Sequence, residues 1–102
     1  MIIVKTSSDN FDVLEKICNQ VIGKKLAACA NIIPNCFSYF YWEGKIQKNQ
    51  EYLVFIKTLK INEKKIYKII KKYHNYDIPE ILTLKLENIE NDYMKWASGE
   101  IN

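Results

Sequence analysis

One short segment holds the only sequence cluster of side chains that we consider for metal binding. His74 is the only histidine of the chain, and Asp77 and Glu80 follow it closely. Imidazole and carboxylate together suit Cu(II), Zn(II) or Ni(II). The alternative is structural: His74 would end a lysine-rich helix as a cation at the negative end of the dipole, and Glu80 would form an ordinary hydrogen bond. The spacing alone leaves both interpretations open.

The three cysteines offer little further chemistry. Cys18, Cys29 and Cys36 are odd in number and contain no C-x-x-C pair, which argues against a disulfide framework and a structural zinc site. Cys18 falls on an apolar helical stripe and Cys29 within an apolar strand, so we predict that both are small buried residues. Cys36, beside a predicted kink, is the one candidate for soft Cu(I). A reducing compartment fits best, and we expect a cytoplasmic protein.

Catalysis is not predicted from these residues. All 15 basic residues are lysines, so acylphosphatase-type chemistry would lack the arginine that grips phosphate. A Ser-His or Cys-His pair would have to use His74. We therefore expect a binding protein and not an enzyme.

Hydrophobic periodicity predicts the elements that position these residues. The predicted strands cover 1–6, 26–42, 51–58 and 81–86, and the predicted helices cover 10–23, a segment capped by Asn62, and 91–98 with Tyr93 and Trp96 as anchors. Apolar residues recur at i, i+3, i+4 and i+7 from Leu14 and from Ile66. Pro34-Asn35 predicts a kink in the second strand. The order is that of a ferredoxin-like βαββαβ α+β sandwich with a short C-terminal helix, and we predict a single domain over 1–102.

The predicted hairpin carries bulky residues on both of its faces. Phe37, Tyr39 and Tyr41 point one way, whereas Phe40 and Trp42 point the other way. A ferredoxin-like fold covers only one side of its antiparallel sheet with helices. We therefore expect another subunit to cover the second side, with Phe37, Tyr39 and Tyr41 at the interface.

Composition excludes some other partners. An apolar fraction of 48% is typical of a soluble globular protein, and no segment approaches the roughly 20 apolar residues that cross a bilayer, so we expect no membrane partner. Five lysines and a run of aromatic residues could imitate an RNA-binding sheet: Lys60, Lys64, Lys68, Lys71 and Lys72, with residues 39–42. Because the aromatic residues lie on both faces and arginine is absent, we expect no nucleic-acid partner.

Several sequence blocks resemble the CutA divalent-cation tolerance family. They are K-L-A-A-C-A-N-I-I-P at 25–34, Y-W-E-G-K-I at 41–46, Lys57-Thr58, and H-N-Y-D-I-P-E at 74–80. The resemblance implies a ferredoxin-like subunit in a tight homotrimer whose long hairpin strands pair across subunit borders. It also implies a link to copper and other divalent ions, with no established reaction. On this basis we expect weak binding of Cu(II) or another divalent ion at or near His74, Asp77 and Glu80.

Three positions depart from the family pattern. Asn75 stands where proline is common, so the rigidity of that loop is expected to differ. Asn35 stands where glycine is common, and asparagine tolerates the left-handed backbone better than most residues. Lys5 stands where several relatives carry a cysteine that can serve copper, and lysine cannot replace a thiolate ligand.

Two other binding functions follow from the implied assembly. Clefts between subunits could bind a small metabolite or anion, as in the architecturally similar PII signalling proteins, with Trp42, Lys57 and Tyr76 as lining residues. The trimer could also be a scaffold for partner proteins. Both alternatives rest on analogy of assembly alone.

Overall fold

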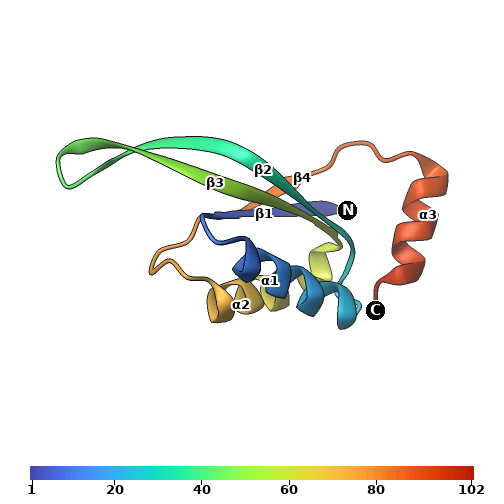
Figure 1. The fold of residues 1–102 in the computed structure, drawn as a ribbon. Coiled ribbons are helices and arrows are strands. Elements are labelled where there is room, and N and C mark those ends of the chain that lie inside the picture. Colours follow the sequence, from blue (N-terminus) through green and yellow to red (C-terminus); the bar gives the residue numbers. More distant parts are fainter.

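The computed structural model describes residues 1–102, and its elements follow the predicted order (Figure 1). The chain contains four strands and three α-helices, in this order: β1 (Ile2–Ser8), α1 (Phe11–Gly23), β2 (Ala27–Trp42), β3 (Lys45–Thr58), α2 (Glu63–Tyr73), β4 (Ile81–Lys85) and α3 (Asn91–Glu100), with a 3-10 turn at Lys60–Asn62. The strands form one antiparallel sheet in the order β2-β3-β1-β4. The predicted ferredoxin-like α+β architecture is confirmed. No helix combines the length and apolar character that a membrane span requires.

The core lies between the sheet and the layer formed by α1 and α2, which cover the same face (Figure 1). Alternate residues of β1 face this layer, and Ile2 and Val4 are buried there. The two helices contribute their apolar stripes, of which the fully buried residues are Leu14, Ile17, Val21, Ile66 and Ile70. The predicted helical periodicity is thus confirmed. Burial of each such side chain contributes roughly 1.5–3 kcal/mol relative to exposure.

The hairpin of β2 and β3 extends far beyond the helix layer (Figure 1). β2 has 16 residues, β3 has 14, and the molecule measures 47 Å along its longest axis. The strands stay paired as far as Trp42 and Lys45, so β3 begins at Lys45 and not at the predicted Glu51. A tight turn with positive φ at Glu43 and Gly44 (51° and 75°) aligns the polar residues that follow with β2. Pairing with a long neighbour therefore extends a strand that local hydrophobicity does not predict.

The predicted kink in β2 is present as a shift in the register of the hairpin. The pairing with β3 is irregular between Ile33 and Cys36, where Pro34 and Asn35 lie. Asn35 has a φ of 63°, in the left-handed region that asparagine tolerates. Its Oδ1 accepts a hydrogen bond of 3.2 Å from Gln50 Nε2. Asparagine therefore forms a turn that glycine could also form.

The two asparagines that precede α1 and α2 have different roles. Asn10 caps α1, because its Oδ1 accepts hydrogen bonds from the backbone N–H groups of Asp12 and Val13. Asn62 precedes α2 but does not cap it, so that prediction is wrong. Its side chain is buried and Nδ2 donates to the carbonyl oxygens of Leu26 (3.1 Å) and Asn102 (3.2 Å). Because the Asn62 side chain bonds to these two acceptors, which are distant in the sequence, it does not bond to the N-terminus of α2.

The second face of the sheet is mostly apolar and has little cover within the chain. Ile33, Leu82 and Leu84 lie on this face and are 46%, 49% and 44% exposed. Helix α3 lies at one end of the sheet and not across it (Figure 1). Its buried residue is Ala97, whereas the predicted anchor Trp96 is half-exposed. A large apolar surface is therefore left open on the side opposite α1 and α2.

Candidate functional site

The loop that follows α2 is fixed to the end of β1 through His74. The Nε2 atom of His74 lies 2.8 Å from the carbonyl oxygen of Ser7 and must be the donor, because a carbonyl only accepts. Nδ1 is then unprotonated, and it accepts a hydrogen bond of 3.0 Å from the backbone N–H of Tyr76. Both ring nitrogens are used within the chain. His74 therefore has a structural role through both ring nitrogens, and this hydrogen-bond pattern does not fit a cation that interacts with the end of the helix.

Tyr76 extends this attachment to β3. Its hydroxyl accepts a hydrogen bond of 2.9 Å from the backbone N–H of Asp9 and donates one of 2.6 Å to Oε2 of Glu51. Glu51 is only 6% exposed. Burial, followed by the hydrogen bond and charge of Glu51, raises the pKa of Tyr76 well above its ordinary value. The hydroxyl therefore stays protonated and available as a donor.

Asn75 holds the same loop through its side chain. Its Oδ1 accepts a hydrogen bond of 2.5 Å from Ser8 Oγ, and its Nδ2 donates one of 2.8 Å to Asp9 Oδ1. Ser8 is fully buried whereas Asn75 is exposed, so the first of these bonds is partly shielded from water. A proline at this position could make neither bond. Asparagine therefore restrains the loop by contacts with β1 in place of a rigid ring.

The predicted metal ligands do not form a three-residue cluster within one chain. Glu80 Oε1 forms an ion pair of 2.8 Å with Lys5 Nζ, and Asp77 is exposed on the loop. No three or more His, Cys, Asp or Glu side chains lie close enough to hold a metal ion together. A metal at His74 would also have to displace one of its two hydrogen bonds. A site at His74, Asp77 and Glu80 thus stays a prediction that requires rearrangement.

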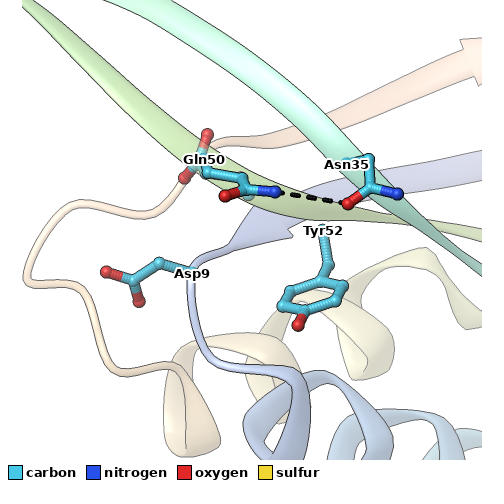
Figure 2. A pocket seen from close by; sticks show the side chains of 5 residues that line it. Asp9, Asn35, Gln50 and Tyr52 are labelled. Atoms are coloured by element: carbon cyan, nitrogen blue, oxygen red, sulfur yellow. Dashed lines mark hydrogen bonds between the residues drawn. The ribbon is translucent and has the colours of Figure 1, made fainter.

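A polar pocket lies next to the Tyr76 hydroxyl, between the end of β1 and the kink of the hairpin (Figure 2). It has a volume of about 170 Å³ and is lined by Asp9, Asn35, Gln50, Glu51 and Tyr52. Neither Asp9 nor Glu51 is predicted from the sequence as a site residue. Asp9 has the pattern of a residue before a helix, and Glu51 that of a residue at the start of a strand. The only signal in the sequence is an acidic residue directly before an apolar strand, which is too common to be specific.

Comparison with known proteins shows the family of the chain. The sequence profile described as CutA1 divalent ion tolerance protein matches residues 2–100. The chain belongs to the CutA1 family. The Divalent-cation tolerance protein CutA of Escherichia coli (strain K12 / DH10B) is 32% identical over 87 residues, which are 85% of this chain and 78% of that protein. Protein CutA, chloroplastic, of Arabidopsis thaliana is 34% identical over 98 residues; the match covers 96% of this chain but only about half (54%) of the Arabidopsis protein.

Solved CutA1 structures share the fold along the whole chain. CutA1 from Oryza sativa has a TM-score of 0.93 and 32% identity, and the match covers 99% of this chain and 93% of the rice chain. CutA1 from Pyrococcus horikoshii has a TM-score of 0.92 and 30% identity, and the match covers 100% and 99% of the two chains. The family resemblance inferred from the sequence blocks is therefore confirmed in both sequence and fold.

The three residues predicted to line a cleft lie far apart within this CutA1-family chain. Trp42 pairs with Lys45 at the tip of the hairpin, whereas Lys57 pairs with Cys29 near its base. The distance along β3 from Lys45 to Lys57 is about 40 Å at roughly 3.3 Å per residue. Tyr76 contacts Glu51 between these two positions. A common cleft would have to draw Trp42, Lys57 and Tyr76 from different subunits, and it stays a prediction.

The predicted interface residues of this CutA1-family chain are exposed on the outer half of the hairpin. Phe37, Tyr39 and Tyr41 are 54%, 65% and 72% exposed. Within the chain, Lys48 Nζ lies 4.9 Å from the ring centroid of Phe37 and 5.9 Å from that of Tyr39. These rings therefore have little apolar contact in a single chain.

Proposed function

We propose that this CutA1-family chain works as a non-enzymatic homotrimer that binds divalent ions. The observation that carries the proposal is the apolar surface formed by the open sheet face and the outer hairpin. Alternate aromatic residues stand on a strand pair that no helix of its own chain covers. Apolar surface of this extent on one protein marks a place of association.

Self-association follows from the energetics of the hairpin. Burial of a large apolar side chain is favourable by roughly 1.5–3 kcal/mol, and each subunit presents several such side chains. An isolated two-stranded hairpin is marginally stable in water, so contacts from neighbouring copies would also stabilise the outer parts of β2 and β3. A homotrimer is the assembly that the family resemblance implies, and it supplies these contacts from like chains.

Light scattering of the purified protein at micromolar concentration tests the assembly. The expected mass is three times the 12.1 kDa of one chain. A well-behaved monomer under these conditions would contradict the proposal, because the open face would then be stable in water.

Divalent-ion binding is supported by the family and by the side chains around His74. The E. coli relative is named for divalent-cation tolerance. We propose that Cu(II) or another divalent ion binds weakly at or near His74, Asp77 and Glu80. The binding is weak because it competes with the hydrogen bonds of His74 and with the Lys5–Glu80 ion pair.

Calorimetric titration with Cu(II) tests this part of the proposal. Wild type is expected to show saturable binding, and a His74→Ala, Glu80→Ala double variant is expected to lose it. Asp92→Asn, which removes one carboxylate on α3, is the matched control and should bind as wild type does. Absence of binding by wild type, or equal binding by the double variant, would refute the site.

The non-enzymatic part of the proposal is supported by the state of the candidate nucleophiles and bases. His74 uses both ring nitrogens in structural hydrogen bonds, so it cannot act as the base of a Ser-His or Cys-His pair without leaving them. Burial raises the pKa of the Cys18 thiol to about 11, which makes it a poor nucleophile at neutral pH. All three cysteines are free thiols, which suits the proposed cytoplasmic location.

A further inference from the structure

Helix α2 holds the positive charge of the protein. It has five lysines and one acidic residue, Glu63, which gives the helix a net charge of +4. The whole chain has a net charge of +3, so the other elements are together slightly negative. Solubility requires no such concentration of charge, because a surface with both signs interspersed is soluble. The distribution therefore indicates a surface with a partner of opposite charge.

The lysines of α2 are exposed and lack counter-charges. Ile66 and Ile70 face the core, and the exposed lysines occupy the rest of the helix: Lys64, Lys65, Lys68, Lys71 and Lys72. None of them belongs to either of the two ion pairs of the chain. Lys72 Nζ lies 5.2 Å from the ring centroid of Tyr73, and Lys16 Nζ of α1 lies 4.8 Å from the same ring. Lys16 thus joins the five lysines of α2, and we call these six residues the lysine surface.

The lysine surface is extended. Lys64, Lys68 and Lys71 are four and three residues apart, so they lie on one stripe of the helix. From Lys64 to Lys72 the charges cover about 12 Å, at 1.5 Å per residue. A row of this kind suits a broad negative surface better than a single small anion.

Two exposed isoleucines flank α2. Ile61 and Ile78 are 80% and 82% exposed, which makes them the most exposed large apolar side chains of the chain. Ile61 lies in the 3-10 turn directly before α2, and Ile78 lies in the loop that follows it. Ile61 precedes Lys64 by three residues in a helical stretch, so the two share a side of the helix. A single exposed isoleucine is ordinary, but one at each end of a cationic helix adds apolar contacts to the charged ones.

This combination favours an anionic lipid surface over a nucleic acid. Lysine is a point charge without the forked geometry with which arginine binds phosphate. The rings of Tyr67 and Tyr73 are partly buried, and the Tyr67 hydroxyl lies 2.7 Å from Oγ1 of Thr83, so α2 offers no open ring on which a base could stack. Anionic headgroups attract clusters of four to eight lysines, and the interface beneath them accommodates apolar side chains.

The lysine surface stays accessible in the proposed trimer. The layer of α1 and α2 lies on the side of the sheet opposite its open apolar face (Figure 1). Association through the open face therefore does not cover α2. The sequence-based expectation of no membrane partner rests on the lack of a spanning segment, and peripheral contact requires none.

We propose that the lysine surface, with Ile61 and Ile78 as shallow anchors, binds the anionic surface of a lipid membrane. Because Ile66 and Ile70 stay in the core, the helix rests on the headgroups and does not insert its buried face. The binding is electrostatic and reversible, and salt weakens it. It does not depend on metal-ion binding.

Sedimentation of the full-length protein with lipid vesicles tests the proposal. Wild type should bind vesicles of phosphatidylcholine and phosphatidylserine at low salt, and should bind neither at high salt nor to phosphatidylcholine alone. Lys64→Gln with Lys68→Gln should weaken the binding roughly 20- to 30-fold. Glutamine is nearly as good a helix former as lysine, so the fold should persist, and circular dichroism checks it. Lys45→Gln with Lys95→Gln is the matched control, because it removes the same charge from exposed lysines of the hairpin tip and α3. It should bind as wild type does.

The isoleucines distinguish a membrane from other polyanions. Ile61→Ser with Ile78→Ser should weaken vesicle binding at least about threefold. Ile46→Ser changes an isoleucine that is 70% exposed at the hairpin and should have no effect.

Three results would overturn the proposal. The first is wild type that does not bind anionic vesicles at low salt, or binds phosphatidylcholine alone equally well. The second is equal loss of binding in the two lysine pairs, since net charge and not the lysine surface would then decide. The third is salt-sensitive binding to duplex DNA or polyglutamate without binding to vesicles, which would identify a nucleic acid or an acidic polypeptide as the partner.

Discussion

The hydroxyl of Tyr76 donates a 2.6 Å hydrogen bond to the carboxylate of Glu51, which joins the loop after α2 to the middle of the long hairpin. The same hydroxyl accepts from the backbone of Asp9, so one oxygen atom links the loop, β1 and β3. Glu51 is buried, and Tyr76 is the residue that satisfies it. The position of the loop and the shape of the adjacent pocket therefore depend on this pair.

Loss of the Tyr76 hydroxyl should destabilise the fold. Tyr76→Phe leaves Oε2 of Glu51 buried without its donor and removes the acceptor of Asp9 N–H, and we expect a loss of about 1–3 kcal/mol in the free energy of unfolding. Urea denaturation measures it. Tyr41→Phe removes an equal hydroxyl from a residue that is 72% exposed and should change stability by less than about 0.5 kcal/mol. Equal stability of the two variants would contradict the structural role of the bond.

Charged residues on the outer hairpin should separate the subunits of the proposed trimer. Tyr39→Lys with Tyr41→Lys places two like charges where the open aromatic surface is proposed to meet another copy, and burial of those charges without partners is costly. Light scattering should show a shift from trimer to monomer at micromolar concentration. Ile61→Lys is the matched control, because Ile61 is 80% exposed but lies in the 3-10 turn after the end of β3, at the opposite end of that strand from the hairpin tip. A trimer that persists in the double variant would exclude this surface from the interface.

A thiol at position 5 should create copper affinity. Lys5 Nζ lies 2.8 Å from Glu80 Oε1, so Lys5→Cys would bring a soft ligand to the neighbourhood of a carboxylate and remove a repelling charge. We expect affinity for Cu(I) to rise by at least about tenfold, because thiolate is the ligand that Cu(I) prefers. Competition with a chromophoric chelator measures the gain. Lys85→Cys adds a thiol elsewhere on the sheet and should show a smaller gain, and equal gains would speak against a role for position 5.

Cys18 should react slowly with alkylating reagents. Burial, with smaller effects from Glu15 and Cys29, raises its pKa from 9.0 to about 11. This rise lowers the thiolate fraction at pH 8 about 100-fold, and the thiolate is the reactive form. Iodoacetamide labelling followed by peptide mass spectrometry should find Cys18 labelled last, with a rate that increases as the pH approaches 11. Cys18→Ser should remove only the slow phase. Rapid labelling of Cys18 at pH 8 would show that the thiol is not shielded.

The stability of α3 should depend on the charge of Glu90. Hydrogen bonds from the backbone N–H groups of Asp92 and Tyr93 hold the pKa of Glu90 below its ordinary value. A lowered pKa in the folded state means that the charged form stabilises the helix above the ordinary glutamate pKa of about 4.3, and that this contribution is lost as the pH falls through the lowered value. Hydrogen exchange of α3 amides should therefore be faster in Glu90→Ala than in wild type at pH 7, after correction for the intrinsic exchange rate. The difference should vanish in strongly acidic solution. Glu87→Ala should show no such pH dependence.

Sequence patterns predict the helices and turns whose formation depends on residues that are close in the sequence. The stripes from Leu14 and Ile66 give α1 and α2, and Pro34-Asn35 marks the irregularity of β2, because each pattern depends on neighbours in the sequence. The start of β3 at Lys45 and the side chain of Asn62 are decided by distant partners, namely β2 and the carbonyl oxygens of Leu26 and Asn102. Sequence periodicity does not carry this information.

The candidate site shows the same division. His74 and Glu80 attract attention because of their residue types, but the sequence does not show that Ser7 and Lys5 are their partners. Asp9 and Glu51 are separated by a helix and a strand, and only the folded sheet brings them to one pocket. Contacts between residues far apart in the sequence are therefore needed to distinguish a side chain that is free to bind a metal ion from one that already has a partner within the chain.

The reach of the hairpin has a kinetic consequence. The outer part of the hairpin, around Tyr39 and Tyr41, is held mainly by the backbone pairing of β2 with β3. A newly made chain can therefore fold its core before the outer hairpin is ordered. In the proposed trimer, the outer hairpin then becomes ordered only when subunits meet. Folding and assembly of the protein would accordingly slow on dilution. The rate of the last step would depend on the concentration of chains and would not be set by a single chain alone.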